Sequence, residues 1–512
     1  MLLLMSLLVS YGTVRAQLKY IEVERPDVLT PVVAERTPIG VRIIELLFEG
    51  LISKDHTGEW VAEIATEVPE HQPGSTEFLV HIKEDARWPD GRNITANDVV
   101  FSLEVYSDEN NNYTNRNILD LFERAEVVDK KTVRFVLKRS DRRAVARTSF
   151  HLMPKHLLPG TYIPESHGYS QRPMGAGPYK VVKSEETTMR LTTNDNYHKQ
   201  PPSIHDIELI VNPVEDVHLT MLLSGLVNLD PVVRPQDVSI IMANTNTDPR
   251  PYDSNTWFGF AYNCRNKFLR FKEVRQALTY LFDREESLRA EYGNYGSVIS
   301  GPYTFSSPYF NTDVTPRSFD EIEGERLLEK VGLVDTDGDG IRDFQGEKMS
   351  LHMVLRKNMS QSDKNVCANF IQQLSAKGIE VIVDWQESAV WYEQIFFRRE
   401  YDITFIAWKF DEANNIYPLF SRTQMLPGLL NFTLFEHDRV EDLLTRFRTT
   451  SDDSERTEVG RHLHEVLNEE APYTFLWTLQ FNAGYRMDSI KRINIDPFYF
   501  FRTIDAWEMA ND

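Results

Sequence analysis

Segments with strand character alternate with segments with helix character along almost the whole chain. Apolar or alternating runs bounded by turn residues predict strands at Glu77–Ile82, Thr132–Leu137, Tyr179–Val182, Ile207–Val211, Trp257–Tyr262, Ser350–Leu355, Glu380–Val383 and Asp402–Ala407. Apolar residues at helical spacing predict helices at Gly40–Leu47, Ala96–Tyr106, Val217–Ser224, Phe271–Leu281, Phe319–Lys330, Lys364–Ala376, Val390–Phe397, Val440–Thr449 and Ser454–Glu469. This alternation predicts an α/β or mixed fold class.

The size and charge of the chain narrow the possibilities further. A chain of 512 residues exceeds what one hydrophobic core usually supports, so we expect two lobes or more. Its formal net charge of -21 argues against nucleic acid as a partner, because phosphate binding needs a basic face. An acidic surface chiefly favours solubility.

The first sixteen residues, MLLLMSLLVSYGTVRA, form an apolar run that is too short to span a bilayer. Val14 and Ala16 are small at the two positions that a signal peptidase reads, which predicts export and a mature chain beginning near Gln17. No positive charge precedes the run, and a buried first strand is the alternative. No cysteine lies near Gln17 to carry a lipid, so a soluble periplasmic protein is expected.

The stretch RWPDGRNITANDVVFSLE, Arg87–Glu104, combines a strand end, a tight turn and a helix start. Pro89-Asp90-Gly91 is turn chemistry, because proline presets φ and glycine tolerates a positive φ. Thr95 and Asp98 have the spacing of a capping box ahead of an apolar helical run.

This stretch resembles the W-x-D-G-x-x-x-T-A-x-D-V-V-F-S block of extracellular solute-binding protein family 5, the ligand-capturing subunits of peptide, nickel and related ABC importers. Further blocks that resemble the family follow in the same order, at Glu45–Asp55, Ala125–Arg139, Met153–Pro159, Gly175–Val182, Phe271–Glu286 and Phe475–Arg486. The resemblance extends from about residue 20 to about residue 500.

The resemblance implies a two-lobed periplasmic-binding-protein fold (class II, cluster C) with mixed sheets and two hinge strands. The crossings between lobes are expected near Trp257–Asn263 and Thr478–Tyr485. The expected parts are lobe one at 17–258 plus 486–512, an inserted subdomain within it at roughly 50–175, and lobe two at 262–482. In such a fold, a ligand closes the lobes by binding the closed state more tightly than the open one.

Two charged residues are candidate receptors for the ends of a peptide. In peptide-binding relatives, a tryptophan closes a buried strand and an aspartate three residues later takes the ligand's ammonium; here these are Trp408 and Asp411. In dipeptide-binding relatives, an arginine after another strand pairs with the ligand's carboxylate, which implicates Arg356. Its planar fork can hold both carboxylate oxygens. Both residues are also compatible with purely structural surface roles.

The resemblance implicates further residues in ligand binding. Glu35, Arg36 and Thr37 lie where family members pair with the peptide main chain as an added strand. Trp391 and Trp385 are candidates for the walls of side-chain pockets, and each could instead belong to the core.

Two other features leave alternatives open. Cys264 and Cys367 could form a disulfide in an oxidising compartment or remain buried free thiols. Asp335–Asp343 has the alternating acids and the sixth-position glycine of a calcium loop. The glutamate that should close such a loop comes one place late, at Glu347, so a turn between a helix and a strand is expected, and no metal.

No motif for catalysis is evident. The chain has no G-x-S-x-G elbow, no zincin helix, no P-loop and no dinucleotide fingerprint. The sequence therefore predicts a cofactor-free, monomeric periplasmic subunit that is not an enzyme and hands short peptides to the membrane permease of an ABC importer. The alternative is the same role for a nickel complex, haem, an opine or a sugar.

Overall fold

The structure is a computed structural model, and it describes residues 17–26, 28–34, 37–55, 59–72, 74–111, 113, 119, 121–164, 166–293, 295–409, 414–450, 452–496 and 498–510. The predicted signal peptide at residues 1–16 lies outside this range, as do Glu35, Arg36 and Asp411.

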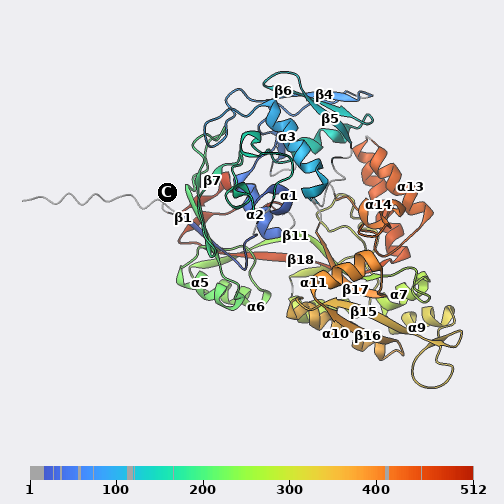
Figure 1. Ribbon diagram of the computed structural model, residues 1–512. Coiled ribbons are helices and arrows are strands. Elements are labelled where there is room, and N and C mark those ends of the chain that lie inside the picture. The colour runs from blue at the N-terminus through green and yellow to red at the C-terminus, as the bar shows by residue number, and fades with distance from the viewer. Residues whose placement is uncertain are drawn as a thin grey trace, which may run out of the picture. The chain divides into compact units, whose positions relative to one another are not determined.

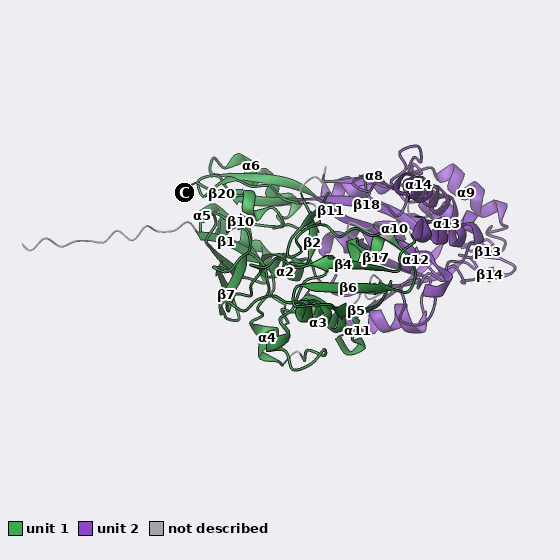
Figure 2. Ribbon diagram, turned by 90° about the horizontal axis from the view of Figure 1, so that it is seen from above, with its two compact units in different colours: residues 1–252, 482–512 green, residues 253–481 purple. Residues whose placement is uncertain are grey.

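The chain divides into two compact units (Figure 2). Unit 1 consists of residues 1–252 and 482–512, and unit 2 of residues 253–481. Two long strands, β11 (Thr247–Tyr262) and β18 (Tyr473–Arg486), contribute residues to both units. The lobe boundaries expected from the sequence fall on these same two strands.

Unit 1 is built on a mixed sheet with the strand order β18-β10-β1-β9-β8-β7, in which β1 runs parallel to both β9 and β10. Figure 1 labels β1, β7 and β18 of this sheet. A separate antiparallel sheet, β4-β6-β5, packs against α3. The strands of unit 1 are β1 (Gln17–Glu22), β2 (Ile52–Lys54), β3 (Trp60–Ala62), β4 (Glu77–His81), β5 (Phe122–Val127), β6 (Thr132–Leu137), β7 (Tyr179–Ser184), β8 (Thr188–Thr193), β9 (Asp206–Val211), β10 (Leu229–Asp230), β19 (Ile490–Arg492) and β20 (Glu508–Met509). Its helices are α1 (Pro31–Ala34), α2 (Pro38–Leu47), α3 (Ala96–Ser107), α4 (Gly168–Gln171), α5 (His218–Ser224) and α6 (Pro235–Ala243).

The turn and helix start predicted at Arg87–Glu104 are confirmed. Gly91 has a φ of +87°, and its N–H donates to the carbonyl of Trp88 at 2.8 Å. The backbone N–H of Thr95 donates to the Asp98 carboxylate at 2.9 Å, which caps α3. The other oxygen of Asp98 accepts from the N–H of Lys155 at 3.1 Å, so this capping residue also secures a segment far along the chain.

Unit 2 contains the sheet order β16-β15-β17-β11-β18, with β12 paired to β18. Its own strands are β12 (Gly296–Val298), β13 (Asp343–Phe344), β14 (Glu347–Lys348), β15 (Ser350–Arg356), β16 (Glu380–Gln386) and β17 (Ile403–Lys409). Its helices are α7 (Lys272–Tyr280), α8 (Arg284–Tyr292), α9 (Glu321–Lys330), α10 (Gln361–Ser375), α11 (Ser388–Tyr392), α12 (Tyr417–Phe420), α13 (Asp438–Thr449) and α14 (Asp453–Glu470).

The central strands of unit 2 are buried on both faces. Met353 and Leu355 of β15 belong to a core that includes Phe370 of α10. Val354, between them, belongs to a second core with Trp391 of α11. Since alternate side chains of a strand point to opposite faces, β15 separates two hydrophobic layers.

The strands and helices predicted from the sequence are confirmed, mostly with small differences at their ends, but β11 begins at Thr247, ten residues before the predicted Trp257. One helix differs in kind, because the predicted Val390–Phe397 is α11 followed by a π-helical turn, Glu393–Arg398. Arg399 ends this turn with a φ of +60°. Several elements were not predicted. α4 and β10 have too few residues to show a periodic pattern, and the longer β1, β8, α6 and α8 were also missed.

Gly175 lies where the start of β7 approaches the end of α2 so closely that a side chain does not fit. A Cβ at this position would lie 2.0 Å from the carbonyl oxygen of Leu47. We expect Gly175→Ala to destabilise unit 1 by about 2 kcal/mol, the usual cost of overpacking, as measured by urea unfolding. Gly160→Ala is the matched control, because nothing lies within 4 Å of its added Cβ. Equal stability of the two variants would contradict this close approach.

Candidate functional site

In unit 2, three parallel strands end at the same edge of the sheet. β15 pairs in parallel with β16 along its whole length and with β17 at Met353 and Ile403. Arg356 and Gln386 are the last residues of β15 and β16 and lie opposite each other in register. Ligands of α/β proteins bind beyond the carboxyl ends of such strands, so this edge is the candidate site.

Arg356 has no ionic partner among the described residues. Its Nε is buried and makes no hydrogen bond. Burial lowers the pKa of the guanidinium, and the charge of Asp363 opposes this effect only in part. Asp363 is itself engaged elsewhere, because its carboxylate accepts a hydrogen bond from the hydroxyl of Tyr292 at 2.5 Å. A partly buried cation with no carboxylate in direct contact is energetically costly, which makes Arg356 a strong candidate for binding an anion.

The guanidinium of Arg356 lies over the indole ring of Trp391, 4.9 Å from its centre. Trp391 is only 6% exposed, and its indole N–H donates to the hydroxyl of Thr404 at 3.0 Å. The sequence leaves open whether Trp391 is a pocket wall or a core residue; in the structure it belongs to a hydrophobic core and also lies against the guanidinium of Arg356. Thr404 was not predicted; the available signal was a polar residue within the buried run Ile403–Ile406.

The other tryptophans predicted for the site lie on the same sheet. Trp408, near the end of β17, is partly buried, pairs in register with Trp257 of β11 and packs against Phe432 at 6.1 Å. Trp385 of β16 is 38% exposed, opposite Leu355 in register. Trp385 therefore has a surface that is accessible to a ligand, whereas most of the Trp391 side chain is buried.

The remaining predicted residue within the described chain is Thr37, in unit 1. Thr37 is the N-cap of α2, and its hydroxyl accepts a hydrogen bond from the N–H of Gly40 at 3.0 Å. Its side chain thus has a structural task at the start of the helix. The backbone pairing expected for Glu35, Arg36 and Thr37 stays a prediction.

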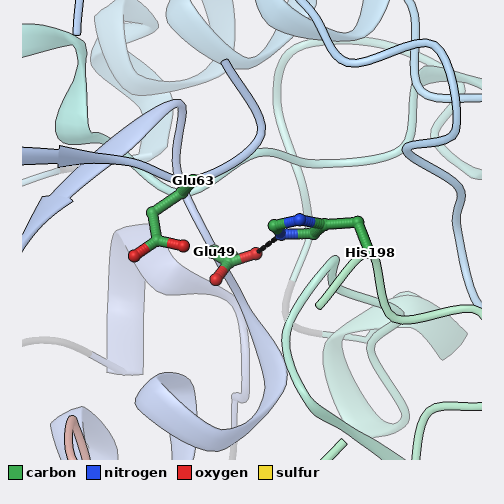
Figure 3. A group of neighbouring side chains, drawn as sticks. All are labelled: Glu49, Glu63 and His198. Carbon is green, nitrogen blue, oxygen red and sulfur yellow. Dashed lines mark hydrogen bonds and ion pairs between the residues drawn. The ribbon is translucent and has the colours of Figure 1, made fainter. Parts of the chain in front are cut away.

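A buried group of ionisable side chains lies in unit 1 (Figure 3). A carboxylate oxygen of Glu49, a carboxylate oxygen of Glu63 and a ring nitrogen of His198 all lie within 4.8 Å of one another. His198 Nε2 contacts one oxygen of Glu49, and the hydroxyl of Tyr197 donates to the other oxygen at 2.9 Å. The hydroxyl of Ser53 donates to Glu63 at 2.5 Å. These residue types are also those of a metal site.

Lys199 supplies the positive charge within this group. Its ammonium lies 3.2 Å from Glu49 and contacts Glu63 directly. Lys83 Nζ lies 3.5 Å from His198 Nδ1, while Nε2 of the same ring contacts Glu49. The cluster is therefore a closed set of ion pairs and hydrogen bonds with an ammonium between the carboxylates, and we assign no metal to it.

The pKa values of the two carboxylates in this cluster are shifted in opposite directions. Burial by itself would raise the pKa of Glu49, but the hydrogen bond from His198 and the charges of His198 and Lys199 lower it to about 2. Burial and the negative charge of Glu49 raise the pKa of Glu63 to about 7, since Lys199 offsets only part of their effect. The pKa of Glu63 is thus close to neutral pH.

The acidic loop Asp335–Asp343 is closed by its own backbone. The two oxygens of Asp335 accept from the N–H groups of Gly338 at 2.7 Å and Gly340 at 2.9 Å. Asp343 accepts from both the N–H and the hydroxyl of Thr336, at 3.0 and 2.9 Å. The loop has the hydrogen bonds of a turn that leads from α9 towards β15.

The two cysteines are not bonded to each other. Both are free thiols, Cys367 fully buried and Cys264 partly buried. Burial raises the pKa of both thiols, as expected for cysteines that serve as small apolar residues.

The fold defines the class of two-lobed periplasmic binding proteins. The family profile described as bacterial extracellular solute-binding proteins, family 5 Middle, matches residues 59–425. The chain belongs to this family. Among curated relatives, it is 25% identical over 450 residues to the oligopeptide-binding protein AppA of Bacillus subtilis, covering 85% of this chain and 81% of that one. It is 22% identical over 472 residues to the dipeptide-binding protein of Escherichia coli, covering 86% and 83%.

Solved structures confirm the predicted fold class. AppA of Bacillus subtilis in complex with a nonapeptide superimposes with a TM-score of 0.80 at 22% identity, covering 96% of this chain and 99% of that one. NikA of Brucella suis in complex with Fe(III)-EDTA gives a TM-score of 0.84 at 16% identity, covering 96% and 99%. Within the described residues, no helix is both long and apolar enough to cross a membrane.

The raised pKa of Glu63 predicts a specific pH dependence of stability. Between the ordinary pKa of 4.5 and the folded value of about 7, the folded protein holds more protons than the unfolded chain. This contribution to stability is present below pH 4.5 and is lost as the pH rises through 7. We therefore expect the stability of the native protein relative to Glu63→Gln to fall by about 2 kcal/mol between pH 5 and 8 in urea unfolding.

Glu186→Gln, which alters an exposed glutamate of the same unit, is the control and should show no such trend. A native-minus-variant difference that stays constant or grows with pH would show that Lys199 keeps Glu63 ionised throughout.

Proposed function

We propose that this protein is the substrate-binding subunit of an ABC importer, and that it captures short peptides and delivers them to the membrane permease. Family membership supports the solute-binding role. The names of its relatives, an oligopeptide-binding protein and a dipeptide-binding protein, support a peptide as the solute. We further propose that residues 1–16 direct export and that the protein acts in the periplasm as a monomer.

The observation that carries the proposal is the unpaired guanidinium of Arg356 at a strand end. A carboxylate offers two oxygens in the geometry of the arginine fork, and it would supply the missing counter-charge. The C-terminus of a peptide is such a group. Asp411, three residues after Trp408, would take the ammonium at the other end of the ligand. Together the two residues would form a receptor for a short zwitterion.

Metal chelates that carry carboxylate groups are a second ligand class that would satisfy Arg356. Structures of the same fold hold Ni(L-His) in NikZ of Campylobacter jejuni and Fe(III)-EDTA in NikA of Brucella suis. Mass spectrometry of material carried through a native purification distinguishes the two classes, because peptides and metal chelates differ in mass and in metal content.

Removing the guanidinium should weaken binding of peptides with a free carboxylate. We expect Arg356→Gln to cost about 2 to 4 kcal/mol of binding free energy for a mixed-sequence tripeptide library, measured by calorimetry, because a desolvated carboxylate loses its charged partner. Lys357→Gln is the matched control, since this exposed neighbour is paired with Glu387 at 3.0 Å. An unchanged affinity in Arg356→Gln would exclude Arg356 as the anion receptor.

The amine receptor is tested separately. We expect Asp411→Asn to cost about 2 to 5 kcal/mol of binding free energy for peptides with a free amino group, the usual range for a charge left unpaired on desolvation. The same variant should bind N-acetylated peptides about as well as the native protein does. If Asp411→Asn weakens both sets equally, or neither, Asp411 does not bind the ammonium.

A further inference from the structure

Arg356 is supported by a chain of buried contacts that ends in the strand next to its own. We propose that Thr404 is a positioning residue: acting through Trp391, it sets the orientation in which Arg356 presents its guanidinium to the carboxylate of a ligand. The proposal rests on the proposed function, because it assumes that Arg356 binds an anion.

Thr404 is held in one orientation by two hydrogen bonds. Its side chain is fully buried, and its hydroxyl donates to the carbonyl of Val354 at 2.7 Å. The hydroxyl hydrogen is therefore committed to Val354, and the oxygen remains free to accept the indole N–H of Trp391 at 3.0 Å. Val354 lies in β15, two residues before Arg356, so one strand both carries the arginine and anchors its support.

Trp391 transmits this constraint to Arg356. Its ring is fixed at one edge by Thr404 and by a perpendicular contact with Phe396 at 5.8 Å. The ring face lies beneath the guanidinium of Arg356, at 4.9 Å. A cation–π contact of this kind covers one face of the guanidinium and leaves the N–H groups at its edge available. The indole thus restricts where the fork of Arg356 can point.

A purely structural role for Thr404 makes a different prediction. If the hydroxyl served only to satisfy the buried N–H of Trp391, its loss would reduce stability and leave ligand discrimination unchanged. Thr404→Val has nearly the same shape but leaves that N–H without an acceptor, so the ring can tilt and release Arg356. Thr404→Ser keeps the hydroxyl and is the conservative control.

The experiment compares two probes: a mixed-sequence tripeptide library with free C-terminal carboxylates, and the same library as C-terminal amides. The readout is the ratio of apparent affinities for acid over amide, measured by calorimetry on the full-length protein. A group that merely stabilises the fold does not move this ratio. We expect Thr404→Val to lower it by about tenfold, the effect of losing an oriented cation–π contact, and Thr404→Ser to keep the native value.

The outcomes separate the two proposals. A native preference for acids that Thr404→Val retains would overturn the positioning role and leave the role of Arg356 intact. A native protein with no preference for acids would overturn both. If Thr404→Val does not fold, Trp391→Phe provides the second variant, because it keeps an aromatic ring but has no N–H for Thr404 to hold. An unchanged ratio in Trp391→Phe overturns the positioning role, and a fall of about tenfold supports it.

Discussion

The central strands of unit 2 are enclosed between two hydrophobic layers, and this enclosure decides where polar chemistry can occur. Met353 and Leu355 pack into one layer, and Val354 packs into the other. A charged side chain on either face of these strands would have to be desolvated. The end of the strand is the position where a cation can remain next to apolar packing and still reach a ligand, and Arg356 occupies that position.

Among the described residues, buried guanidinium groups are bound by a carboxylate, as in Arg42, or by backbone carbonyls, as in Arg284, whereas the buried Nε of Arg356 has no hydrogen-bond partner. In unit 1, Arg42 holds both oxygens of Glu22, at 2.6 and 2.8 Å. The carboxylates of Glu49 and Glu63 likewise share an ammonium. In such sets each buried charge has a partner within the set, which offsets the cost of its desolvation. A partly buried guanidinium with no carboxylate in direct contact leaves an electrostatic cost that a bound anion would relieve.

Local chemistry explains why so much of the fold was predictable. The turn at Gly91, the cap formed by Thr95 and Asp98, and the helix behind them depend on residues close together in sequence. The structure adds a contact between two motifs that are separate in the sequence. Ser102 of α3 accepts from the N–H of Met153 at 2.8 Å, so the helix after the turn binds a segment about fifty residues further on.

The sequence by itself determined the alternation of strands and helices and the family, because periodicity, turn chemistry and motif order depend on neighbouring residues. The resemblance to that family then implicated Arg356 as a candidate receptor. Only the tertiary structure decided that Trp391 lies under Arg356 and that Thr404 holds the indole in place. Arg356 and Trp391 are 35 positions apart, and Trp391 and Thr404 are 13 apart. These contacts depend on strand register and on which face of α11 meets the sheet, and no local pattern encodes either.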